Sequence, residues 1–104
     1  MDRDQFLKAA MSALRDTFGD RLCGLVLYGS EARGEAGPDS DIDLLVLLTG
    51  PVQHGVDSRT CIHALYPMVL ELGRPIHAKP VDVKDYEARK APLYQEAQRE
   101  GVRV

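Results

Sequence analysis

The chain alternates between segments with helical spacing of apolar side chains and short, continuous apolar runs. Residues 3–18 repeat apolar positions every three to four residues, which predicts an amphipathic helix capped by Asp2 and ended at Gly19. Short apolar runs, the second from Leu44 to Leu48, lie beside Gly and Pro and predict two strands, over 22–28 and 41–49. Because the second run is continuous, we expect this strand to be buried on both faces.

A second helical pattern covers residues 58–72, after a connection over 53–56. We expect its apolar stripe to face the core; the stripe consists of Ile62, Leu65, Tyr66, Val69 and Leu72. Pro67 lies inside this pattern and removes one backbone hydrogen bond. The sequence therefore predicts a kink or a break in the turn before Pro67.

The last third of the chain predicts shorter elements. Residues 75–81 read as a third strand, and their prolines favour an edge position because proline donates no ladder hydrogen bond. Two short helices are expected over 83–90 and 92–100, with residues 102–104 as a terminal extension. The whole pattern predicts an α/β (α+β) fold, with a small sheet of about three strands and three to five helices on its faces.

Length, charge and cysteine content narrow the kinds of protein that this chain can be. A length of 104 residues favours one domain, which we expect to span residues 1–104. A net charge of −3 argues against broad electrostatic binding of nucleic acid, and no apolar run reaches the length of a membrane span. Cys23 and Cys61 form no C-x-x-C motif, so we expect two buried free thiols in a cytoplasmic protein.

Two aspartates begin the second predicted strand. Strand side chains alternate between faces, so Asp41 and Asp43 project from the same face. Two neighbouring carboxylates resist joint ionisation unless a cation lies between them. Carboxylate oxygens are hard ligands, so the pair predicts a site for Mg²⁺ or Mn²⁺.

A Gly–Ser step follows the first predicted strand and suits a phosphate group. Gly29 has no side chain, so a ligand can approach its backbone closely. Ser30 to Arg33 predict a short helical turn, and free N–H groups at the start of such a turn attract anions. Arg33 is either a phosphate ligand or a surface arginine that contacts a neighbouring carboxylate. A polyphosphate held by this turn would meet a metal held by Asp41 and Asp43.

Gly29-Ser30, ten intervening residues and Asp41-x-Asp43 together resemble the signature of the DNA polymerase β-like nucleotidyltransferase superfamily. The longer strings Gly-Ser-x-Ala-Arg-Gly and Asp-Ser-Asp-Ile-Asp-Leu-Leu-Val resemble the minimal nucleotidyltransferases, short prokaryotic proteins often encoded beside a HEPN-domain partner in toxin–antitoxin pairs. The resemblance implies a mixed sheet and transfer of a nucleoside monophosphate, AMP from ATP, to a hydroxyl on a partner protein. It also implies that Mg²⁺ or Mn²⁺ assists this transfer.

The resemblance further implies a third acidic residue, on the strand beside Asp41 and Asp43. If the next helix starts near Asp82, this position falls near Lys79, whose positive charge repels metal. Asp82 is the remaining acid, and it either completes a catalytic set or caps the following helix.

Two interpretations of function stay open. With a third acid, the chain is an ATP- and magnesium-dependent enzyme that modifies a HEPN-type partner. Without it, the chain is a catalytically impaired antitoxin that acts by binding, or a nucleotide-sensing subunit. The chain is short, so the acceptor site would come from a partner protein or from a second copy in a homodimer.

Overall fold

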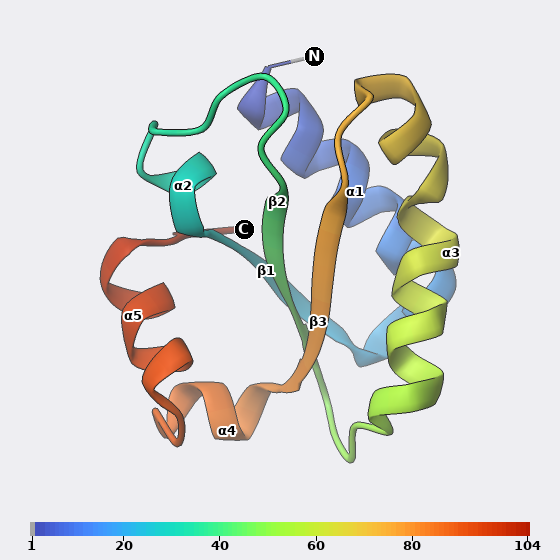
Figure 1. The fold of residues 1–104 in the computed structure, drawn as a ribbon. Helices are drawn as coiled ribbons and strands as arrows, with labels where there is room; N and C mark the ends of the chain where they lie inside the picture. Colours follow the sequence, from blue (N-terminus) through green and yellow to red (C-terminus); the bar gives the residue numbers. More distant parts are fainter. Residues whose placement is uncertain (1) are drawn as a thin grey trace.

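A computed structural model describes residues 2–104 as a sheet with helices on both faces (Figure 1). Its elements in chain order are α1 (Arg3–Phe18), a 3₁₀ turn (Gly19–Arg21), β1 (Leu22–Tyr28), α2 (Gly29–Ala32), β2 (Ile42–Leu48), α3 (His54–Leu72), β3 (Ile76–Asp82), α4 (Val83–Glu87), α5 (Pro92–Glu100) and β4 (Val102–Arg103). Asp2 caps α1 as expected, since its side chain accepts a hydrogen bond from the Gln5 N–H at 2.8 Å. None of the described helices is long and apolar enough to cross a membrane.

The sheet is mixed, as expected, but it has four strands instead of about three. The strand order is β3-β2-β1-β4, with β2 and β3 parallel and the other pairs antiparallel. The extra strand is the short terminal segment, where Val102 pairs with Leu27 and Arg103 with Val26. The edge position of β3 agrees with its prolines.

Two apolar cores hold the layers together. Helices α1 and α3 cover one face of the sheet, and α4 and α5 cover part of the other (Figure 1). Leu44, Val46 and Leu48 of β2 pack into the first core, while Leu45 and Leu47 pack into the second. The expectation that β2 is buried on both faces is therefore confirmed. Asp43 lies on the α4/α5 face, because its position has the same parity as Leu45 and Leu47.

Helix α3 begins at His54, so the expected connection over 53–56 is wrong in its last three residues. The helix starts early because Asp57 is buried and fully paired inside its first turn. The Asp57 carboxylate accepts hydrogen bonds from Arg21 at 3.1 and 3.2 Å and from the Gln53 N–H at 3.0 Å. These bonds lower the pKa of Asp57, with the Arg21 bond as the largest cause.

The expected break before Pro67 is also wrong, because α3 runs through Pro67 as one helix. Pro67 lies on the exposed side, where water can satisfy the carbonyl that loses its partner. Ile62 and Tyr66 are exposed instead of buried. Leu65 of the expected stripe is buried, and the core side of α3 is completed by Cys61 and Met68.

The two cysteines differ in their environment. Cys61 is buried and free, as expected, and burial raises the pKa of its thiol to about 12. Cys23 is free but exposed, which corrects the expectation of two buried thiols. It follows the 3₁₀ turn at the start of β1, where the pairing with β2 shifts register between Leu22 and Gly24.

Candidate active site

Three strand ends meet on the α4/α5 face of the sheet. In the register between β1 and β2, Tyr28 lies opposite Asp43. In the parallel register between β2 and β3, Asp43 lies beside His77. Asp41 comes immediately before β2, so the two predicted metal ligands, Tyr28 and His77 are brought to one end of the sheet.

The carboxylates of Asp41 and Asp43 lie in different environments. Asp41 is exposed, and its Oδ2 is 3.1 Å from Nε2 of His77. Asp43 is half-buried, and burial raises its pKa above the ordinary value of a carboxyl group. The charge of Asp41 raises the pKa of Asp43 further, while His77 opposes this effect. A cation beside Asp43 would remove much of the cost of ionising it in this position.

The turn at Gly29 adjoins the Asp43 carboxylate directly. Gly29 has a φ of +74°, which a residue with a side chain adopts only with strain. A Cβ at this position would lie 2.6 Å from Oδ2 of Asp43, closer than atoms of this kind approach one another. The absence of a side chain at Gly29 therefore allows the turn and the acid to occupy adjoining space. This close approach places the predicted phosphate turn beside Asp43, one of the two predicted metal ligands.

Arg74 fixes two loops of the site at once. Its Nη2 and Nη1 donate to Oε2 and Oε1 of Glu31 in α2, at 2.8 and 3.3 Å. Its Nε donates to the carbonyl of Ser40 at 2.8 Å. The same guanidinium thus holds α2, which begins at Gly29, and the end of the loop that leads into Asp41. A two-bond arginine–carboxylate contact restricts orientation as well as distance.

The other two predicted phosphate ligands are placed differently. Ser30 is the second residue of α2, directly after Gly29. Arg33 points to neighbouring carboxylates, with Nε 3.0 Å from Glu35 Oε1 and Nη1 3.6 Å from Glu100 Oε2. Of the two alternatives for Arg33, its side chain adopts the contact with neighbouring acids.

His77, and not Lys79, occupies the position beside Asp43 on the third strand. Lys79 lies beside Leu45, one step further into the sheet on the same face. Asp82 lies beside Leu48 at the opposite end of β3, five residues after His77 and roughly 16 Å along the strand. It caps α4 by accepting a hydrogen bond from the Lys84 N–H at 2.9 Å. Asp82 is therefore not brought together with the paired aspartates, and the expectation that it completes their set does not fit its position.

An open cleft of about 490 Å³ lies beside these residues. It follows the edge strand β3, with Asp43, His77 and Lys79 on the α4/α5 side and Ser58 and Ile62 of α3 on the other. This volume lies within the usual range of small-molecule sites.

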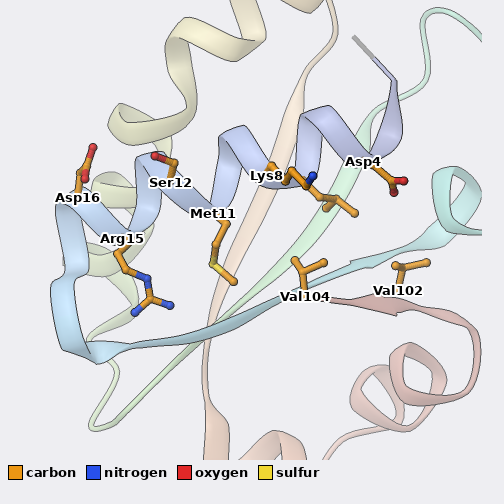
Figure 2. Close-up of a pocket in the computed structure, with 9 residues that line it drawn as sticks. Asp4, Lys8, Met11, Ser12, Arg15, Asp16, Val102 and Val104 are labelled. Atoms are coloured by element: carbon orange, nitrogen blue, oxygen red, sulfur yellow. The ribbon is translucent and has the colours of Figure 1, made fainter.

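A second groove, of about 480 Å³, lies between α1 and β4 (Figure 2). Its apolar part is formed by Leu7, Met11, Val102 and Val104, and the predicted site residues do not line it. Charged side chains from α1 lie at its rim, but Asp4 and Asp16 come from opposite ends of that helix, so they form no acid pair (Figure 2). Of these two spaces, the cleft along β3 is the one lined by Asp43, a predicted metal ligand.

The donor set fits a hard divalent cation held jointly with a nucleotide. Among residues 2–104, no group of three or more His, Cys, Asp or Glu side chains is arranged to hold a metal ion. Magnesium, however, is usually bound by one or two carboxylates together with substrate phosphates and water. Asp41 and Asp43 supply this number of carboxylates, and Gly29 leaves room for phosphate oxygens beside them.

Sequence reasoning missed the roles of two residues near the acids. For His77 a signal was present, because the helix stop at Gly73 indicates that the third strand starts soon after it. The Ile42 N–H donates to the Pro75 carbonyl at 2.9 Å, and in this register His77 lies beside Asp43. Arg74 carries no such signal, because its partners Glu31 and Ser40 lie 43 and 34 residues away in the chain.

Comparisons with known proteins agree with this architecture. A sequence profile described as "Nucleotidyltransferase domain" matches residues 8–102. A Methanocaldococcus jannaschii protein named as a protein adenylyltransferase is 29% identical over 70 residues, which cover 67% of this chain and 70% of that protein.

Solved structures show the same fold. The crystal structure of a toxin–antitoxin with AMP-PNP has a TM-score of 0.66 and 20% identity, and the match covers 92% of this chain and 69% of that chain. A mutant of the MntA–HpeT toxin–antitoxin has a TM-score of 0.64 and 19% identity, covering 100% of this chain and 72% of that chain. Because the family profile spans nearly the whole sequence, the chain belongs to the nucleotidyltransferase domain family.

Proposed function

We propose that the chain transfers AMP from ATP to a hydroxyl group on a partner protein. The observation that carries this proposal is the contact at Gly29, where an added Cβ would meet Asp43 Oδ2 at 2.6 Å. A triphosphate in this turn would lie directly beside the two acids. Asp41 and Asp43 are the residues we assign to hold Mg²⁺ or Mn²⁺, and Gly29 and Ser30 those that contact the phosphates.

The residues of the chain then have distinct tasks. Gly29 and Ser30 orient the triphosphate, and Arg74 keeps their turn aligned with the loop before Asp41 through Glu31. A bound divalent cation supplies positive charge that stabilises the phosphate oxygens during transfer. The acceptor oxygen forms a bond to the α-phosphorus, the bond from this phosphorus to pyrophosphate breaks, and the hydroxyl proton leaves to solvent.

A protein is the acceptor that we assign to the open cleft. The cleft extends along the edge of β3, without a second layer of chain to enclose a small acceptor among the described residues. The names of the similar proteins, a protein adenylyltransferase and toxin–antitoxin complexes, support a protein acceptor and an antitoxin role. We therefore assign a cytoplasmic partner of HEPN type. A homodimer stays a prediction, which native mass spectrometry tests.

A second function is favoured by His77. An imidazole stands beside Asp43, where the resemblance implies a carboxylate, and it contacts Asp41 at 3.1 Å. An imidazole suits Mg²⁺ less well than a carboxylate oxygen does. The alternative is therefore an antitoxin that neutralises its partner by binding, or a nucleotide-sensing subunit, with little or no transfer.

One experiment separates the two functions. The protein is incubated with ATP labelled at the α-phosphate, Mg²⁺ and the protein encoded beside its gene. Label on that partner, lost in Asp41→Ala, supports the transferase. A stable complex without label at any Mg²⁺ or Mn²⁺ concentration supports the binding function and refutes the transferase.

A further inference from the structure

The outer face of α3 carries an apolar stripe that leads to the cleft. Ile62, Tyr66 and Leu70 follow one another at intervals of four residues, so they share one side of the helix over about 12 Å. Their exposed fractions are 56%, 54% and 65%. These three residues, the α3 stripe, form a row instead of the single exposed apolar side chains that are normal on a surface.

The α3 stripe is continuous with the candidate active site. Ile62 belongs to the stripe and also lines the cleft that contains Asp43, His77 and Lys79. Because β3 is an edge strand, no further strand separates α3 from the acids on this side of the sheet. A protein seated on the stripe would reach Asp43 by passing around the edge of β3.

The charges around the stripe define the chemistry of the protein that fits it. Arg59 and His63 are exposed on α3 beside the stripe, whereas the exposed acid Glu71 lies about 100° around the helix from Leu70. Lys79 adds an exposed positive charge at the cleft. The complementary surface is therefore an apolar helix face flanked by acidic side chains.

We infer that the α3 stripe is the docking surface for the partner protein, which presents its acceptor hydroxyl to the cleft at Asp43. This inference rests on the proposed transfer to a protein. It makes docking a separate property of α3, since Tyr66 and Leu70 do not line the cleft. Docking and transfer can then be lost independently.

The test uses charged substitutions on the stripe and a matched control on the same helix. Tyr66→Glu and Leu70→Asp should each weaken binding of the protein encoded beside this gene by at least about tenfold, the usual effect of losing a central apolar contact. Val56→Asp is the control, because Val56 is 49% exposed on α3 but lies six residues before Ile62, outside the stripe and outside the cleft. Binding is measured by biolayer interferometry, and thermal unfolding confirms that each variant is folded.

The outcomes distinguish the inference from the proposed function. Weaker binding in Tyr66→Glu and Leu70→Asp, with Val56→Asp within about twofold of wild type, supports the inference. Equal binding by all variants, no binding by wild type, or a homodimer that only the stripe variants disrupt would overturn it. Asp43→Asn should keep docking and lose transfer. Docking that depends on the stripe while wild type transfers no AMP leaves the inference standing and refutes the transferase.

Discussion

Gly29→Ala gives a direct test of how the phosphate turn and Asp43 share space. The substitution has two separate effects. At a φ of +74°, an alanine costs about 1–2 kcal/mol of backbone strain, partly offset by a less flexible unfolded chain. The new Cβ would also lie 2.6 Å from Asp43 Oδ2, and this carboxylate must move because such contacts are not seen below 3.0 Å.

Gly34→Ala is the matched control. Gly34 has a φ of +73°, so the strain is the same, but a Cβ there meets nothing within 4 Å. Both variants should lose about 1 kcal/mol of stability, which lowers Tm by roughly 4–8 °C for a domain of this size. The extra cost in Gly29→Ala is small, because the displaced oxygen is the end of a side chain that can rotate.

Nucleotide affinity should separate the two variants. Moving the Asp43 carboxylate should weaken binding of Mg·ATP to Gly29→Ala by at least about tenfold, since misplacing a ligand by a fraction of an ångström costs several-fold to a hundredfold in function. Gly34→Ala should bind within about threefold of wild type. Titration with a fluorescent ATP analogue, in Mg²⁺ and in EDTA, measures both. Equal affinity of the two variants would refute the link between the turn and the acid.

Three further substitutions test the supports of the site. Asp57→Asn should lower the free energy of unfolding by about 2 kcal/mol. Because Arg21 lowers the pKa of Asp57, this stability is present above about pH 4 and is lost as pH falls below it, so Tm of the wild type should fall more steeply in acid than Tm of the variant. Arg74→Met should weaken Mg·ATP binding about tenfold with a change in Tm of only a few degrees, since it frees Glu31; unchanged affinity would contradict its positioning role. His77→Asp should raise AMP transfer to the partner by at least about tenfold by adding a hard oxygen donor, whereas His77→Ala should not, and equal rates in both would argue against this position as the third ligand.

Local patterns predicted most of the fold, and long-range pairing decided the rest. The helix over 3–18 and the buried strand after Asp43 follow from apolar spacing and capping, which depend on neighbouring residues. The early start of α3 depends on Asp57 meeting Arg21, 36 residues away, and no local pattern contains this pair. Ile62 is exposed because α3 packs on the core through Cys61, Leu65 and Met68, and apolar spacing alone did not separate these positions from Ile62.

In the candidate site as well, local spacing predicted some features and long-range strand pairing decided the others. The spacing of Gly29 and Asp43 predicted that both lie at adjoining strand ends, and the antiparallel register of β1 and β2 places them there. Identifying the residue of β3 that lies beside Asp43 required the register between β2 and β3. Counting back from a helix start near Asp82 gave Lys79. Helix α4 does begin there, but the pairing of β3 with β2 places His77, and not Lys79, beside Asp43.

Calorimetric titration of ATP in the presence of Mg²⁺ tests the central claim, that the paired acids hold a cation for a triphosphate in the Gly29 turn. Wild type should bind ATP with Mg²⁺ at least about tenfold more tightly than with EDTA, and Asp43→Asn should abolish this difference while it stays folded. Asp39→Asn, an exposed acid of the preceding loop, should keep the difference. Binding that is independent of Mg²⁺, or that is as tight in Asp43→Asn as in wild type, would contradict the claim.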